Sequence, residues 1–226
     1  MKSNLEDMHK IIFIHGFGVT KNARGLFTDI AKAFEEKGIE CILTDLNVVD
    51  ESGNITLNTI SKQVEIIQKV FQENYREGDT LDLICHSQGC VVGAIADLPH
   101  IRKVILMTPP TNNDVQKTLE FFKSRPDTVI NLEGDSYMTR ADGTRTIAHK
   151  EYWQDRQGMN YLDEYKNLAQ HNNVTTIIAN QDEVVDNSAA EELAKTTNLI
   201  HLNGDHNLTG ESRKGLISIL QKTLLD

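Results

Sequence analysis

The chain contains Leu83-Ile84-Cys85-His86-Ser87-Gln88-Gly89-Cys90, an apolar run that leads directly into a serine. Small residues, Cys85 and Gly89, lie two positions before and after Ser87, and a predicted helix over residues 91–97 follows. A serine on a tight turn between a strand and a helix needs small neighbours there, because the turn is strained and closely packed. The turn also places the hydroxyl at a helix N-terminus, where partial positive charge favours a developing anion. We therefore predict that Ser87 is a nucleophile; the alternative is a serine that only caps the helix.

Short apolar runs rich in Ile, Val and Leu alternate with segments of helical periodicity along the chain. The runs occupy residues 11–14, 39–43, 81–85, 104–107, 174–179 and 199–202. Runs without polar alternation are typical of strands that are covered on both faces. The clearest helical stripe spans residues 57–75, and a last helix follows Gly210. The alternation predicts an α/β fold with an open, doubly wound, mainly parallel sheet, whose ligands bind beyond the carboxyl ends of the strands.

A segment of more than sixty residues interrupts this rhythm, too long for a simple crossover between strands. It covers residues 111–172 and contains Asp142-Gly143, which is typical of a hairpin turn. We expect helices near residues 115–123 and 161–170 on either side of this hairpin. More than half of the aromatic residues of the chain lie in the segment, which indicates a lid over the site within a single domain. The alternative is a structural excursion with a small core of its own.

A second tight turn follows the first apolar run, in His15-Gly16-Phe17-Gly18. Acyl transfer builds negative charge on a carbonyl oxygen, and fixed backbone N–H groups must point at it. We expect these donors to be Phe17 and Gln88, the latter being the residue after the nucleophile. A phosphate-binding loop is the alternative, but the spacing matches neither common glycine-rich pattern. His15 is interpreted as a structural, hydrogen-bonded residue.

A serine nucleophile needs a base, and the base needs an acid that orients it. Asp182 follows the fifth apolar run, with Glu183 and Asp186 as competitors for the role of the acid. His206 follows the sixth run, and its position favours it over the other seven histidines as the base. The glycine loop, serine, acid and histidine then all lie at one edge of the sheet, in the chain order Ser, Asp, His.

With these motifs the sequence resembles the α/β-hydrolase superfamily, and in particular its small esterase-like and lipase-like serine hydrolases. The resemblance covers nearly the whole chain and implies an oxyanion loop at residues 15–18, an elbow at residues 85–89 and a histidine loop at residues 204–206. It also implies that no metal and no organic cofactor is needed. Because only about ten residues precede the first run, we expect six strands in the spatial order 2-1-3-4-5-6. We expect the substrate pocket to include His86, Tyr137 and Trp153.

The composition excludes several classes of partner. Of the 226 residues, 39% are hydrophobic and 25% are charged, as in an ordinary globular domain. A formal net charge of −10 argues against nucleic acid or an anionic membrane surface as a partner. No apolar run approaches the roughly 20 residues that span a bilayer, and residues 11–14 are too short for the core of a signal peptide. Three cysteines, an odd number, favour free thiols, so we expect a cytoplasmic protein, with a homodimer left open.

The sequence therefore predicts a carboxylesterase-like serine hydrolase that cleaves a small-molecule ester of small to medium acyl size through an acyl-enzyme. An aminopeptidase or a thioesterase with the same triad is the alternative within enzymes. A non-catalytic ligand-binding protein on a hydrolase scaffold is the alternative of another class, because a fold alone does not determine function.

Overall fold

A six-stranded sheet forms the centre of the computed structural model, which describes residues 7–113, 116–123, 125–187 and 189–226. Its strands are β1 (His9–Ile14), β2 (Glu40–Leu43), β5 (Thr80–His86), β6 (Ile101–Met107), β9 (Asn173–Ala179) and β10 (Asn198–Leu202). Neighbouring strands are parallel throughout, in the order β2-β1-β5-β6-β9-β10. This confirms the predicted six strands, their spatial order and the α/β-hydrolase fold class.

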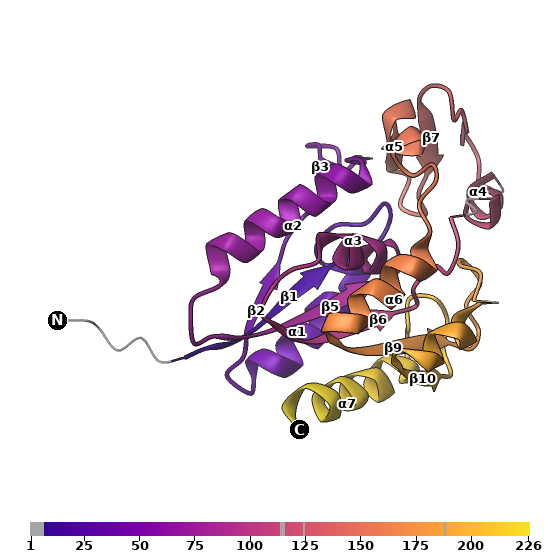
Figure 1. Cartoon of the computed structure of the whole chain (residues 1–226). Helices are drawn as coiled ribbons and strands as arrows, with labels where there is room; N and C mark the ends of the chain where they lie inside the picture. The colour runs from indigo at the N-terminus through magenta and orange to yellow at the C-terminus, as the bar shows by residue number, and fades with distance from the viewer. Residues whose placement is uncertain (1–6, 114–115, 124, 188) are drawn as a thin grey trace.

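Helices cover both faces of this sheet (Figure 1). One face carries α1 (Leu26–Glu35) and α7 (Glu211–Leu225); the other carries α2 (Ile60–Asn74), α3 (Gln88–Ala96) and α6 (Tyr161–His171). The strands divide their side chains between two apolar cores. In β1, for example, Ile12 and Ile14 belong to the core beneath α2, α3 and α6, whereas Ile11 and Phe13 belong to the core beneath α1 and α7. Burial on both faces explains why the sequence shows continuous apolar runs instead of alternation.

The predicted helices lie close to their observed positions. The stripe at residues 57–75 corresponds to α2, which begins later than the stripe because Thr59 caps it: its side chain accepts a hydrogen bond from the Lys62 N–H. The final helix, α7, begins after Gly210 as expected. The helix expected near residues 115–123 is α4 (Gln116–Lys123), and residue 115 lies outside the described residues.

A second, four-stranded sheet lies outside the main sheet, with the order β3-β4-β8-β7. Its members are β3 (Val48–Val49), β4 (Ile55–Thr56), β7 (Ser136–Thr139) and β8 (Arg145–Ala148). The hairpin predicted around Asp142-Gly143 forms, since β7 and β8 pair in antiparallel fashion. The β3–β4 hairpin was not expected; it lies between β2 and α2, and β4 pairs in parallel with β8.

We refer to α4, β7, β8 and α5 (Lys150–Asp155) together as the cap. In Figure 1 the cap lies at the upper right, away from the layers of helix and sheet. It is attached to the body at α2, where Asp155 accepts hydrogen bonds from the N–H and the hydroxyl of Ser61 at 2.9 and 2.6 Å. α6, which belongs to the same long segment of sequence, packs instead against α3 in the helical layer.

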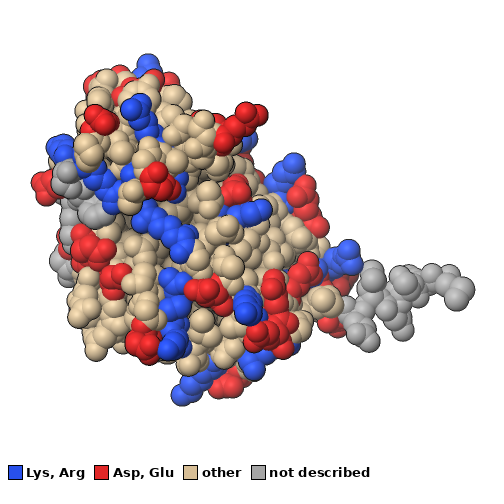
Figure 2. Space-filling view, turned by 180° about the vertical axis from the view of Figure 1, so that it is seen from behind, with Lys and Arg blue, Asp and Glu red and all other residues tan. Residues whose placement is uncertain are grey.

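Seen from behind, acidic and basic side chains are interspersed over the visible face, without a continuous basic field (Figure 2). No helix among the described residues is long and apolar enough to cross a bilayer.

Candidate active site

Ser87 lies at the turn between β5 and α3, with φ 54° and ψ −128°. A positive φ is unusual for a residue with a side chain, and strained backbone of this kind is concentrated at functional sites. The Ser87 side chain makes no capping hydrogen bond to α3. The alternative that Ser87 serves only as a helix cap is therefore wrong, and its hydroxyl is available for another partner.

Two glycines of α3 allow this turn to pack closely. A Cβ on Gly89 would lie 2.7 Å from the carbonyl oxygen of His15, so only glycine fits there. A Cβ on Gly93 would lie 2.7 Å from the Sγ of Cys85. Cys85 lies two residues before Ser87 and is larger than a glycine would be at that position. It fits because Gly93, one turn along α3 from Gly89, has no side chain.

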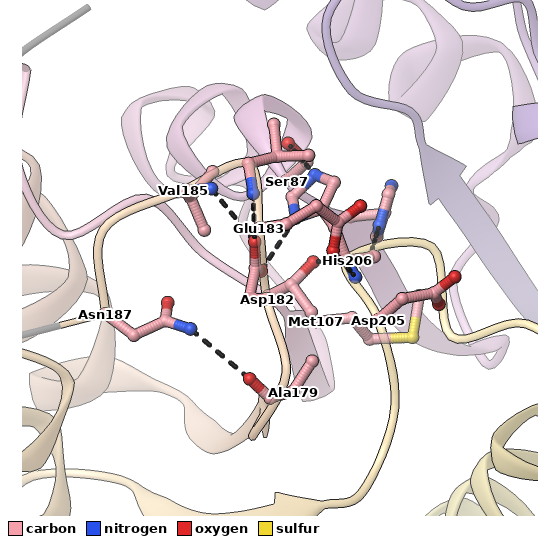
Figure 3. A network of polar contacts seen from close by, with 12 residues as sticks. Ser87, Met107, Ala179, Asp182, Glu183, Val185, Asn187, Asp205 and His206 are labelled. Carbon is pink, nitrogen blue, oxygen red and sulfur yellow. Dashed lines mark hydrogen bonds and ion pairs between the residues drawn. The ribbon is translucent and has the colours of Figure 1, made fainter. Parts of the chain in front are cut away.

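The structure brings Ser87, His206 and Asp182 together at the carboxyl ends of β5, β10 and β9 (Figure 3). The Ser87 Oγ lies 3.0 Å from the His206 Nε2, and the His206 Nδ1 lies 2.7 Å from the Asp182 Oδ2. With Nδ1–H donating to the carboxylate, Nε2 carries the lone pair and accepts the hydrogen bond of the hydroxyl. This is the arrangement of a nucleophile, a base and an orienting acid.

The Asp182 side chain is fully buried, and its second oxygen, Oδ1, accepts hydrogen bonds from the N–H groups of Val184 and Val185 at 2.8 and 2.9 Å. Burial alone would raise the pKa of Asp182, but the hydrogen bond and charge of His206, with the two backbone N–H groups, outweigh it and lower the pKa. The carboxylate is therefore ionised at neutral pH. Its competitors lie elsewhere: Glu183 accepts from the backbone N–H of His206, and Asp186 accepts from the Asn112 side chain.

Two further histidines support the site without facing a reacting atom. His86 lines the pocket as predicted, and its buried Nε2–H donates to the carbonyl oxygen of His206 at 3.0 Å. Burial, together with the charge of His206, lowers the pKa of His86 to about 3, so this ring is neutral at physiological pH. His15 donates from Nδ1 to the Gly16 carbonyl and accepts at Nε2 from the Leu46 N–H. His15 is thus a structural residue, as expected.

A pocket of about 100 Å³ opens over Ser87 and His206. Phe17 and Gln88, the expected oxyanion donors, both line it. The N–H of Gln88, the first residue of α3, has no partner inside the helix. Its apolar lining includes Val19, Pro110, Phe122, Val184 and Val185.

Tyr137 and Trp153, which were expected in the pocket, are not among the described residues that line it. Trp153 is buried in the same apolar core that lies beneath α2, α3 and α6, edge-on to Tyr152 at 5.1 Å between ring centroids. The Tyr137 hydroxyl points to Asp135 on its own hairpin. Trp153 thus joins the cap to this core, and Tyr137 contacts its own hairpin, while Phe122 and Tyr161 are aromatic residues of the long segment that line the pocket.

Three charged residues of the pocket were not predicted from the sequence: Arg24, Arg156 and Glu183. Glu183 was considered only as the acid that orients His206. Arg24 belongs to the short helix η1 (Ala23–Gly25), and Arg156 follows α5. No pattern around either arginine distinguishes it from the other arginines of the chain. Among the described residues, no group of three or more His, Cys, Asp or Glu side chains is arranged to hold a metal ion.

Comparison with known proteins places the chain in a family. The family model described as palmitoyl protein thioesterase matches residues 10–209, whereas no curated protein matches the sequence. Est1E from Butyrivibrio proteoclasticus, solved with ferulic acid bound, has a TM-score of 0.73 and 17% identity over 99% of this chain and 91% of its own. The Pyrococcus furiosus esterase Pf2001 has a TM-score of 0.70 and 14% identity over 97% of this chain and 81% of its own.

The esterase domain of a Rhodothermus marinus protein is similar as well, with a TM-score of 0.65 and 14% identity over 98% of this chain and 88% of its own. At such identities the structural likeness shows the fold, and the family match shows the class of chemistry. The chain is an ester-cleaving hydrolase of the α/β-hydrolase fold, and it belongs to the palmitoyl protein thioesterase family.

Proposed function

We propose that Ser87, His206 and Asp182 form the catalytic triad of this hydrolase, and that the reaction passes through an acyl-enzyme. One observation carries the proposal: the continuous hydrogen-bonded path from the Ser87 hydroxyl through the His206 ring to the buried Asp182 carboxylate, beside a pocket. This path also favours an enzyme over a non-catalytic binding protein, because simple binding has no need of an oriented base next to a strained serine.

In the first half of the reaction, His206 takes the proton of Ser87 as the Oγ attacks the substrate carbonyl. The N–H groups of Phe17 and Gln88 stabilise the oxyanion that forms. His206 then gives its proton to the leaving group, which departs and leaves an acyl-Ser87 ester. In the second half, water attacks this ester with His206 again as the base, and the acid product and the free hydroxyl are released.

The size of the pocket supports a substrate with a small to medium acyl group. About 100 Å³ lies below the roughly 300–1,000 Å³ that is typical of pockets for drug-sized ligands. A carboxylic ester remains our first candidate, and the description of the family makes a thioester the second. An aminopeptidase is not the activity that the family description names.

The lid expected at residues 111–172 is also a proposal. Phe122 of α4 and Arg156 after α5 line the pocket, which supports a covering role for the cap. Because α6 packs against α3, we restrict the proposed cover to the cap. Cytoplasmic localisation and a homodimer stay predictions from the sequence.

A substrate panel tests the proposal: nitrophenyl esters from acetyl to palmitoyl, and thioesters of the same acyl groups. We expect kcat to be highest for short and medium acyl groups, and Ser87→Ala to lower it by about 10⁴–10⁶-fold. Ser218→Ala is a matched control, since Ser218 is exposed on α7, far along the chain from the turn, and should retain full activity. Retained turnover in folded Ser87→Ala protein would contradict the assignment.

A further inference from the structure

Two arginines line the same pocket as Ser87 and reach it from different parts of the fold. Arg24 comes from η1, which follows the oxyanion loop, and Arg156 comes from the end of α5 in the cap. Neither is needed to hydrolyse a neutral ester, because the triad and the backbone N–H groups supply that chemistry. We therefore ask which group of a substrate these two arginines could bind.

Arg156 is held in place by neutral oxygens. Its Nε donates to the Tyr161 hydroxyl at 3.1 Å and to the Asn113 Oδ1 at 3.3 Å, and its Nη1 donates to the Tyr152 hydroxyl at 3.2 Å. The guanidinium also lies over the Tyr152 ring, 5.6 Å from its centroid. These contacts orient the group but do not neutralise it.

No carboxylate of the described residues forms an ion pair with Arg156, and its Nη2 donates to none of the described residues. A half-buried cation that none of the described carboxylates neutralises is costly unless another anion lies against it. The Nη2 amino group of Arg156 is thus left with N–H donors that no described residue accepts, and such donors on a fixed guanidinium are suited to an oxyanion.

Arg24 lies in a strained backbone conformation, with φ 54° and ψ 38°. Its side chain is exposed and makes no hydrogen bond or ion pair with a described residue. Burial of part of its stem and repulsion from Arg140 and Arg125 lower the pKa of Arg24, which shows that further positive charge lies nearby. Strain at a residue with a free cationic head, on the rim of a reactive site, is typical of a ligand contact.

The acidic side chains near the pocket offset only part of this charge. Asp142, the carboxylate that attracts Arg24, also lies 3.7 Å from Arg140, and Glu183, which lines the pocket, accepts a hydrogen bond from the His206 backbone. The chain as a whole carries a net charge of −10, so its long-range field repels anions. Any preference for an anionic substrate must therefore come from the arginines near the pocket, of which Arg24 and Arg156 line it.

We propose that Arg24 and Arg156 bind a carboxylate or phosphate group of the substrate, so that this hydrolase prefers anionic esters or thioesters. The inference rests on the proposed triad and adds a substrate class to it. The anion can be carried by the acyl part or by the leaving group, because both arginines line the pocket that contains Ser87.

Two matched pairs of esters distinguish these sources. The first pair is 4-nitrophenyl hydrogen adipate against 4-nitrophenyl hexanoate, which places a carboxylate or a methyl group at the end of the acyl chain. The second is 4-carboxyphenyl butyrate against 4-acetylphenyl butyrate, which places the charge on the leaving group. The measured quantity is the ratio of kcat/KM within each pair, with each rate normalised to the alkaline hydrolysis of the same ester.

We expect the wild-type protein to favour the anionic member of at least one pair by roughly ten- to a hundredfold, the range of a hydrogen-bonded charge contact. The pair that shows the preference identifies the part of the substrate that carries the anion. Raising the ionic strength should reduce the preference. A ratio near one in both pairs would overturn the proposal.

Variants separate a local contact from a general charge effect. Arg156→Gln should bring the ratio close to one, and Arg24→Gln, at an exposed side chain that holds no part of the fold, should lower it severalfold. Arg145→Gln removes an exposed arginine of β8 that does not line the pocket, and it should leave the ratio unchanged. If Arg145→Gln lowers the ratio as much as the other two, the proposal is wrong.

The proposed triad fails separately from the proposed anion site. If neutral esters are cleaved in a Ser87-dependent way without a preference for anions, only the anion site is refuted. If Ser87→Ala retains activity toward both members of a pair, the triad itself is refuted.

Discussion

Replacing Gly93 by alanine tests how the turn at Ser87 tolerates a cysteine two residues before the serine. A Cβ at position 93 would lie 2.7 Å from the Sγ of Cys85 and 3.3 Å from the Cδ1 of Ile14. Both partners are fully buried, so neither can move aside without disturbing the apolar core under α3. The turn that presents Ser87 lies between these two packed positions.

The size of the effect follows from two opposing terms. Alanine is favoured over glycine inside a helix by about 1 kcal/mol, whereas overpacking a dense core costs about 1–3 kcal/mol. We expect Gly93→Ala to lower the free energy of unfolding by about 1 kcal/mol. In a Cys85→Ala background the sulfur is gone, and the same change should raise the free energy of unfolding by up to about 1 kcal/mol.

Urea unfolding of the wild type, both single variants and the double variant gives the four free energies that are needed. The predicted interaction energy between positions 85 and 93 is about 2 kcal/mol. The double variant should therefore be more stable, by about this amount, than the sum of the two single changes predicts. Additive changes, within about 0.5 kcal/mol, would refute the account of how this turn is packed.

Two further predictions concern Asp182, which binds His206, and His86, which precedes Ser87 in the chain. Asp182→Asn should lower kcat by about 10⁴-fold with little change in KM, because an amide no longer holds His206 in the tautomer with its lone pair toward Ser87. Steady-state kinetics with a nitrophenyl ester measures this change. A loss of kcat below tenfold would contradict the role of Asp182. The pKa of His86 is about 3 in the folded protein and 6.5 as the ordinary value, so the unfolded chain binds the extra proton between these pH values. His86 therefore contributes stability above pH 6.5 that is progressively lost as the pH falls toward 3. His86→Gln should flatten this dependence of the unfolding free energy on pH, measured by urea unfolding between pH 6.5 and pH 4.

The main sheet and the three residues at its edge were predictable because the relevant patterns are local. Ser87, Asp182 and His206 each follow a buried strand within a few residues, and parallel strands carry their carboxyl ends to one edge. A correct strand assignment therefore brings these side chains close together without any knowledge of their contacts. The Asp-Gly turn between β7 and β8 is a local pattern of the same kind.

Features that depend on contacts between distant segments were not predictable. β3 and β4 have two residues each, too few to show a period, and β4 pairs with β8 some ninety residues away. The aromatic content of the long segment indicated a cover but not which rings face the pocket: Trp153 packs into the core, and Phe122 reaches the site. Arg24 and Arg156 became visible only when the fold placed them on one cavity.

Covalent labelling tests the central claim most directly, that an oriented base activates one particular serine. The protein is treated with a fluorophosphonate probe, and the labelled peptide is identified by mass spectrometry. We expect rapid attachment of one probe at Ser87, no labelling of Ser87→Ala, and labelling of His206→Ala slowed by at least a hundredfold. Labelling at another residue, or equal rates in the wild type and His206→Ala, would contradict the account.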